Sequence, residues 1–119
     1  MYKNYGDINF FEYGRLLEKT EDANCFNVLV CNYVCDCTDS ERCFQFDCCY
    51  VDISDSWIDV KEVEDYADCR KENEPERFAL ACIEYYGVEN FGGTAYYNES
   101  QFYTEDEIRE QLKNYEIEL

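Results

Sequence analysis

Residues 25–53 constrain the fold of this chain more than any other stretch, because they hold two apolar segments separated by a polar turn. Successive side chains of residues 26–36 alternate between two faces, and both faces are apolar. One face carries Leu29, Cys31, Tyr33 and Cys35, and the other carries Val28, Val30 and Val34. This pattern is typical of a central strand that is covered on both sides.

Residues 43–53 continue the pattern after a polar turn at residues 36–42. In this second segment the alternation is between Phe44, Phe46, Cys48 and Tyr50 on one side and Cys43, Gln45, Asp47 and Cys49 on the other. We therefore predict that residues 26–36 and 43–53 pair as antiparallel strands.

Two further strands are expected on weaker patterns. Residues 8–18 favour a strand because Phe10 and Phe11 are β-formers and Gly14 suits a bulge, while a helix over the same residues stays open as an alternative. Residues 94–97 are a candidate fourth strand.

Helices are expected at residues 56–69, 74–86 and 105–115. The first has apolar residues at helical spacing, namely Trp57, Val60, Val63 and Ala67. The second has Pro75 in its first turn and ends at Gly87. Its expected buried stripe consists of Phe78, Ala81, Cys82 and Tyr85.

The third helix begins with a capping box formed by Thr104 and Glu107. The order of strands first and helices afterwards predicts an α+β fold, in which helices pack on a small antiparallel sheet of three to four strands. The length of 119 residues suits a single domain, residues 1–119.

The charge of the chain is strongly negative, with 28 acidic and 10 basic residues and a net charge of −18. Residues 54–91 carry eleven acids and four bases, so that much of the excess lies in the helical half. Such a charge disfavours direct binding to nucleic acid or to an anionic membrane surface. No stretch approaches the roughly 20 apolar residues that a membrane-spanning helix needs.

The acidic helices predict a basic partner. Carboxylates three or four positions apart on a helix lie about 5–6 Å apart, which is close to the spacing of phosphates along a DNA strand. The expected contact residues are Asp59, Glu62, Asp65, Asp68, Glu72 and Glu74, with Glu105, Asp106 and Glu110 as a second cluster. Tyr96, Tyr97 and Tyr103 are expected to stack on arginine side chains at the rim.

The absence of histidine excludes several chemistries. A chain without histidine has no Ser-His or Cys-His pair and no HExxH zinc protease motif, and Gly92-Gly93 is not followed by the lysine of a P-loop. We therefore expect no catalytic residue, no cofactor and no enzymatic activity.

Nine cysteines and an N-terminus without a secretory signal favour reduced thiols in a cytoplasm. Several of the cysteines alternate with apolar residues along a strand, which is typical of buried structural thiols. Disulfides in a secreted chain are one alternative. Another is a zinc site formed by Cys35, Cys37, Cys43 and either Cys48 or Cys49, although the paired C-x2-C spacing is absent.

The segments ALACIEYYGVENFGG and YTEDEIREQLKNY, within residues 55–119, resemble small acidic proteins carried by phages and mobile elements of Gram-positive bacteria. Some members of that class are antirestriction or anti-CRISPR proteins that occupy the DNA-binding groove of a defence nuclease. The resemblance implies a DNA mimic that inhibits by steric and electrostatic competition. The alternatives are a cysteine-rich zinc module and an accessory protein whose acidity serves only solubility.

Overall fold

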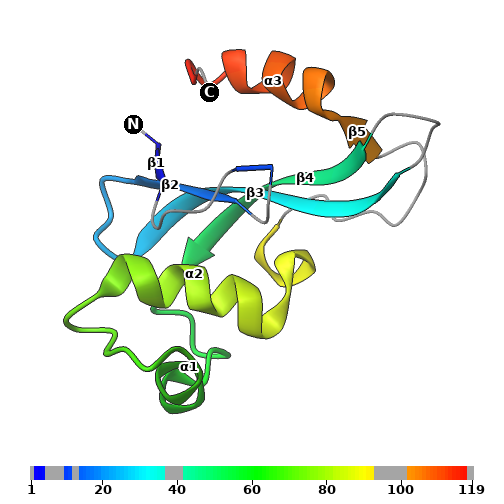
Figure 1. The fold of residues 1–119 in the computed structure, drawn as a ribbon. Helices are drawn as coiled ribbons and strands as arrows, with labels where there is room; N and C mark the ends of the chain where they lie inside the picture. The colour runs from blue at the N-terminus through cyan, green and yellow to red at the C-terminus, as the bar shows by residue number, and fades with distance from the viewer. Residues whose placement is uncertain (1, 5–9, 12–13, 37–41, 93–101, 118–119) are drawn as a thin grey trace.

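A computed structural model of the chain describes residues 2–4, 10–11, 14–36, 42–92 and 102–117. Within these residues five strands form one antiparallel sheet in sequence order (Figure 1). The strands are β1 (Lys3–Asn4), β2 (Arg15–Lys19), β3 (Cys25–Asp36), β4 (Arg42–Asp52) and β5 (Phe102–Thr104). The helices are α1 (Val60–Ala67), α2 (Pro75–Tyr86), the 3-10 helix η1 (Val88–Phe91) and α3 (Glu105–Lys113). The predicted α+β class is confirmed, with five strands in place of three to four.

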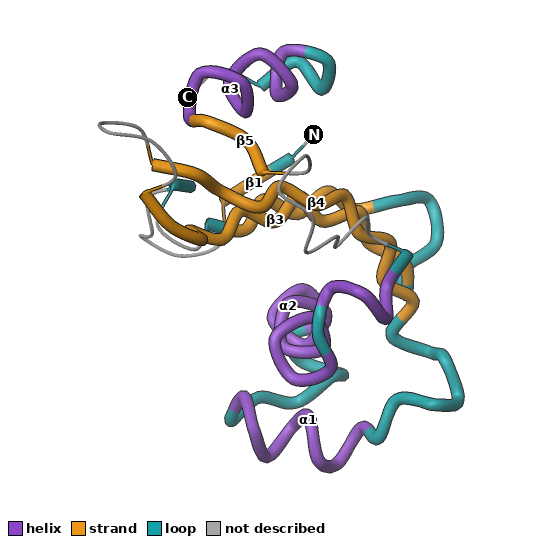
Figure 2. The backbone as a smooth tube through the Cα atoms, turned by 90° about the vertical axis from the view of Figure 1, so that its right-hand side faces the viewer, coloured by secondary structure: helices purple, strands orange, loops and turns teal. Residues whose placement is uncertain are grey.

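The helices lie in layers on the two faces of the sheet (Figure 2). Helix α3 covers one face, α2 covers the other, and α1 lies on the side of α2 that is remote from the sheet. This stacking makes the molecule long, with extents of 45 × 26 × 24 Å. Within the part of the chain that the structure describes, α1 is the outermost layer, and no further element covers its outer side.

The strand pair predicted at the centre is confirmed, because β3 pairs with β4 along nearly its whole length. Val28 and Val30 are fully buried on the α2 side of β3, and Leu29 and Cys31 are fully buried on the α3 side. Both faces of β3 are thus covered, as the alternation of apolar residues predicts.

Each face of the sheet has its own apolar core. The α2-side core includes Leu17, Phe26, Val28, Val30, Cys49, Val51, Ile53, Val63, Phe78, Cys82, Ile83 and Phe91. The α3-side core consists of Phe10, Phe11, Leu16, Leu29, Cys31, Phe44, Phe46, Ile108 and Leu112. The sheet therefore joins two clusters that share no side chain.

The first segment differs from the prediction. Among the described residues of this segment the strand is β2, and Phe10 and Phe11 lie in a turn that buries both rings in the α3-side core. Gly14 does not form a bulge: its N–H donates to the Phe10 carbonyl at 3.0 Å, and an added Cβ would lie 2.1 Å from Phe10 Cα. A side chain has no room in this tight turn. The candidate strand at residues 94–97 lies outside the described residues.

The predicted helices are confirmed in type and order, with one substantial difference in length. Helix α1 begins at Val60, four residues later than predicted, so that Trp57 precedes the helix and is largely exposed. Helix α2 ends at Gly87 as predicted, but Tyr85 lies outside its buried stripe. Helix α3 has the predicted capping box between Thr104 and Glu107.

Candidate interaction surface

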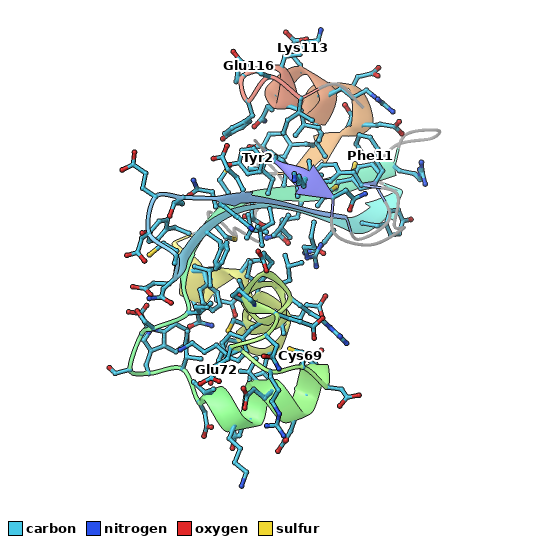
Figure 3. All side chains as sticks on the ribbon, turned by 90° about the vertical axis from the view of Figure 1, so that its left-hand side faces the viewer. Tyr2, Phe11, Cys69, Glu72, Lys113 and Glu116 are labelled. Atoms are coloured by element: carbon cyan, nitrogen blue, oxygen red, sulfur yellow. The ribbon has the colours of Figure 1, made fainter. Side chains whose placement is uncertain are left out.

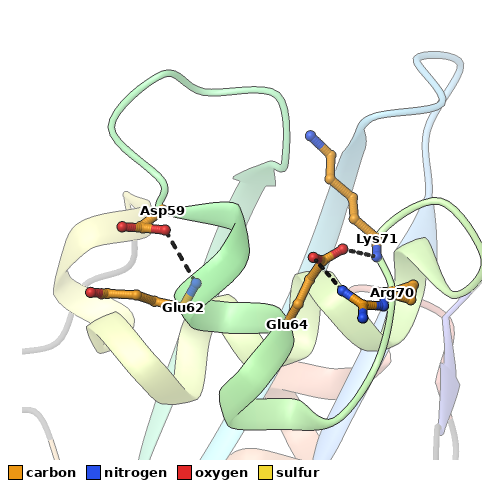
Figure 4. Close-up of polar contacts among 5 residues, drawn as sticks. All are labelled: Asp59, Glu62, Glu64, Arg70 and Lys71. Atoms are coloured by element: carbon orange, nitrogen blue, oxygen red, sulfur yellow. Dashed lines mark hydrogen bonds and ion pairs between the residues drawn. The ribbon is translucent and has the colours of Figure 1, made fainter.

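The outermost helix, α1, is fixed by its caps and by one buried residue. The Oδ1 atom of Asp59 accepts the backbone N–H of Glu62 at 3.1 Å, as Figure 4 shows. The backbone N–H of Asp59 donates to Tyr86 Oη at 2.8 Å, which ties the start of α1 to α2. Val63 is fully buried against α2, and Asp68 ends the helix with a left-handed φ of 51°.

Five aromatic rings form a continuous row over α1, α2 and η1, which we call the aromatic stripe. It runs through Phe91, Trp57, Tyr86, Tyr85 and Tyr66, with successive ring centroids 5.3, 4.9, 4.9 and 5.4 Å apart. Edge-on and tilted contacts of this length are the preferred geometry of aromatic pairs, so that each ring helps to fix the next.

Much of the aromatic stripe is exposed. Trp57 is 46% exposed, Tyr66 is 55% exposed and Tyr85 is 40% exposed, whereas Phe91 is buried. These three residues are among the most exposed large apolar side chains of the described residues. Contiguous exposed apolar surface with a polar rim is typical of a site that contacts another molecule.

Two carboxylates accept hydrogen bonds from the polar atoms of the aromatic stripe. Trp57 Nε1 donates to Asp55 Oδ2 at 3.3 Å, and Tyr85 Oη donates to Glu62 Oε2 at 2.8 Å. The hydrogen bond to Glu62 raises the pKa of Tyr85 above its ordinary value, because it stabilises the protonated phenol beside a negative charge. Both carboxylates thus combine with the rings into one surface.

The predicted contact residues near α1 keep most of their charge uncompensated. Among the described residues, no ion pair within 4.0 Å is found for Asp59, Glu62, Asp65, Asp68 and Glu72. Glu64 is different, because it forms an ion pair with Arg70 at 3.3 Å and accepts the backbone N–H of Lys71 at 3.0 Å (Figure 4). Glu74 is also paired, with Arg77 at 3.5 Å.

The predicted second cluster lies on α3, on the other side of the sheet from α1. Figure 3 shows Lys113 and Glu116 on one side of the sheet and Glu72 on the other. Glu105 forms ion pairs with Arg109 at 2.8 Å and Arg42 at 3.5 Å, and Glu110 pairs with Lys113 at 3.1 Å. The two clusters therefore form separate surfaces, and only Asp106 of the second lacks an ion pair among the described residues.

The predicted aromatic rim is placed differently. Tyr96 and Tyr97 lie outside the described residues. Tyr103 packs against the α3-side core, with its ring centroid 6.5 Å from that of Phe46. The exposed rings that adjoin the acidic residues are instead Trp57, Tyr66 and Tyr85.

A hollow of about 420 Å³ opens between α1 and α2 beside the stripe. It is lined by Tyr66, Ala67, Arg77, Leu80, Ala81 and Glu84. The Nη2 atom of Arg77 donates to the Ala67 carbonyl at 2.8 Å, so that this cation is held by the end of α1 and by Glu74. The charged groups of this lining are one base, Arg77, and one acid, Glu84.

The seven cysteines whose side chains the structure describes are free thiols, and no metal-binding group of cysteines and carboxylates is found among the described residues. Cys43 and Cys48 are five positions apart on β4, so that they project from opposite faces, one buried and one exposed. Cys49 shares a face with Cys43, but six strand positions span about 20 Å. Neither cysteine can join Cys43 at one tetrahedral ion. Cys37 lies outside the described residues.

A buried polar group lies on the α2 side of the sheet. Asp47 is fully buried, and neither of its carboxylate oxygens has a hydrogen-bond partner. The Nε2 of Gln45 and the Nε of Arg15 are also unpartnered. Since Asp47 has no exposed surface, it cannot act as a general base on a substrate that arrives from solvent. Its burial without hydrogen-bond partners instead affects the stability of the fold.

Sequence reasoning located the acidic residues but missed the aromatic stripe. The available signal was Tyr85-Tyr86: adjacent residues on a helix are about 100° apart, so both rings cannot lie on one buried stripe. Tyr86 takes the position one turn after Cys82, which leaves Tyr85 outside.

Comparison with known proteins gives no family for this chain: no protein-family model, no curated protein and no solved structure matches it. Within the described residues, none of the helices combines the length and the apolar character required to cross a bilayer.

Proposed function

We propose that this chain is a non-enzymatic acidic binding protein of the cytoplasm that inhibits a basic nucleic-acid-binding protein. The target class is a restriction or CRISPR effector nuclease, or another DNA-binding protein, and the chain acts as a DNA mimic in its nucleic-acid groove. The inhibitor needs no chemistry, because occupying the groove is sufficient to exclude DNA.

One observation carries the proposal: the acidic residues around α1 are exposed and lack cationic partners within the described chain. Asp59, Glu62, Asp65, Asp68 and Glu72 all meet this description. Lys61 precedes Asp65 by one helical turn, yet no ion pair joins them. Negative charges that are not neutralised by an ion pair are available to a partner, and a group of them attracts the cations that would otherwise bind phosphates.

The α1 surface, rather than α3, is the stronger candidate for the contact. On α3 two of the three predicted residues are already paired with arginine or lysine. A partner would have to break those ion pairs before it gained new ones, whereas Asp59 and Glu62 accept only neutral N–H and O–H donors. The expected interface is therefore centred on α1.

Capture of partners from a bacterial host lysate, with duplex DNA as competitor, tests the proposal. A captured nucleic-acid-binding protein that DNA releases, and whose affinity falls steeply with added salt, is the expected result. Capture of a partner that is indifferent to both DNA and salt would contradict mimicry and indicate an accessory role.

Two charge-neutralised variants sharpen the test. The pair Asp59→Asn and Glu62→Gln removes two charges from α1, while Asn still caps the helix and Gln still accepts from Tyr85. The matched control, Asp106→Asn with Glu110→Gln, removes two charges from α3. We expect the first variant to weaken partner binding and the second to leave it nearly unchanged.

A further inference from the structure

We infer that the aromatic stripe is an arginine-binding surface, on which guanidinium groups of a partner stack between exposed rings and carboxylates. This inference rests on the proposed function and specifies its recognition chemistry. It concerns the exposed members of the stripe, Trp57, Tyr66 and Tyr85, with Asp55 and Glu62 at their edges.

The geometry of the stripe favours stacking. Its rings pack against one another at centroid distances of 4.9 to 5.4 Å. The rings therefore lose little conformational freedom when a partner binds to them. The cation–π contacts among the described residues involve the rings of Phe44, Phe78 and Phe11. None of these contacts involves a ring of the aromatic stripe. The exposed ring faces are thus not occupied by the chain's own arginines and lysines.

The carboxylates beside the rings favour arginine over lysine as the cation that stacks on the aromatic stripe. A guanidinium group is planar, stacks on an aromatic face and donates from its edge to carboxylate oxygens. The aromatic stripe offers both features together, because Asp55 accepts a hydrogen bond from the indole N–H of Trp57 and Glu62 accepts one from the hydroxyl of Tyr85. A lysine ammonium is a compact, strongly hydrated point charge and gains less from this combination.

The charge around the stripe argues against other occupants. Residues 55–66 carry five acids and one base, so that the phosphates of a nucleic acid would be repelled even though its bases could stack on the rings. A second copy of this chain would bring another net charge of −18 to the same surface. An arginine-bearing protein is the occupant whose charge complements the rim.

Binding to the aromatic stripe can be followed by tryptophan fluorescence, because Trp57 is the only tryptophan of the chain. An oligoarginine peptide and an oligolysine peptide of equal length are titrated into the full-length protein, and the emission of Trp57 is followed. We expect the oligoarginine to bind more tightly and to change the emission more. Equal affinity for the two peptides would overturn the inference, because charge alone would then explain binding.

Removal of one ring separates stacking from charge. Tyr66→Ala leaves every acid in place, and we expect it to weaken oligoarginine binding about threefold, with a smaller effect on oligolysine. The matched control is Tyr50→Ala, which removes a tyrosine of similar exposure (53%) from β4, away from the stripe. Equal effects of the two variants, with both folded by circular dichroism, would overturn the inference.

The outcomes distinguish this inference from the proposed function. If the captured DNA-competed partner binds Tyr66→Ala as well as the wild type, the stripe has no such role while mimicry stands. If oligoarginine is preferred but no DNA-competed partner is captured, the arginine surface stands while mimicry fails. Self-association of the wild type that Tyr66→Ala abolishes would assign the stripe to a second copy and overturn the inference.

Discussion

Arg15 and Asp47 lie on the same face of the sheet, because both are opposite Val30 of β3, one from β2 and the other from β4. Two strand spacings separate their Cα atoms by about 10 Å, and no ion pair within 4.0 Å joins their side chains. The guanidinium group of Arg15 donates to the Cys31 carbonyl at 3.2 Å and to Asn32 Oδ1 at 2.9 Å. Asp47 is left buried with no hydrogen-bond donor.

This placement changes the acidity of Asp47. Burial raises its pKa from the usual 3.8 to about 6, Arg15 opposes the shift, and Glu89 adds to it. Since the pKa is higher in the folded state than in the unfolded state, ionisation of Asp47 destabilises the fold. The cost is absent below about pH 4 and is fully present above about pH 6.

We therefore predict that Asp47→Asn stabilises the protein at neutral pH. The variant has nearly the same shape and no charge, so that at pH 7.5 its free energy of unfolding should exceed that of the wild type by about 3 kcal/mol. Urea denaturation of both proteins from pH 4 to pH 8 measures the difference.

The pH dependence is the critical feature of this prediction. The extra free energy of unfolding of Asp47→Asn should shrink as the pH falls through about 6, because Asp47 then becomes protonated in the wild-type fold. Asp106→Asn, at an exposed position, is the control and should show no comparable gain. A gain that did not vary with pH would contradict the assignment to the charge of Asp47.

A second prediction concerns Gly14. Gly14→Ala should cost at least about 2 kcal/mol, because its Cβ would lie 2.1 Å from Phe10 Cα and the turn that buries Phe10 would have to move. Gly92→Ala is the control: it has a φ of 72° but no atom within 4 Å of the added Cβ, so that only the backbone strain of about 1 kcal/mol applies. Equal costs in urea denaturation would contradict the steric explanation.

The fold could be predicted where local patterns decide it. The apolar alternation on both faces of β3 requires cover on both sides, and Thr104 with Glu107 fixes the start of α3. The pattern cannot say which helix covers which face, because Leu29 and Val28 are equally apolar. The long sequence separation between β3 and α3 leaves that choice to tertiary packing.

The candidate surface was predictable only in part. The acids of both predicted clusters can be located from the sequence, but their state of pairing cannot: on α3, Glu105 is paired with Arg42 of β4, which lies 63 positions earlier. The aromatic stripe likewise joins residues of separate segments: Phe91 of η1, Trp57 of the turn before α1, and Tyr86 of α2. Trp57 has the spacing of a buried helical residue, but the cap at Asp59 excludes it from α1.

A third prediction concerns thiol reactivity. Cys48 is the exposed cysteine among the seven that the structure describes, and the others are buried. Burial raises the pKa of Cys31, Cys49 and Cys82 to about 12, which suppresses the reactive thiolate. Iodoacetamide should therefore modify Cys48 much faster than these three under native conditions.

Peptide mass spectrometry after short labelling measures the order of reaction. Unfolding in urea should remove the difference in labelling rate, because burial then no longer raises the pKa of Cys31, Cys49 and Cys82. Rapid labelling of Cys49 in the folded protein would contradict the placement of this side chain in the α2-side core.

The last prediction separates the two roles of Asp59, which caps α1 and contributes charge to the candidate surface. Asp59→Ala removes both and should destabilise the protein by about 1 kcal/mol, whereas Asp59→Asn keeps a good N-cap and should cost much less. Urea denaturation measures the cap, and binding of the basic partner measures the charge. If the charge matters for recognition, both variants should lose a similar amount of affinity although only Asp59→Ala loses stability. Loss of affinity in Asp59→Ala alone would mean that an ordered α1, and not the carboxylate, is what the partner requires.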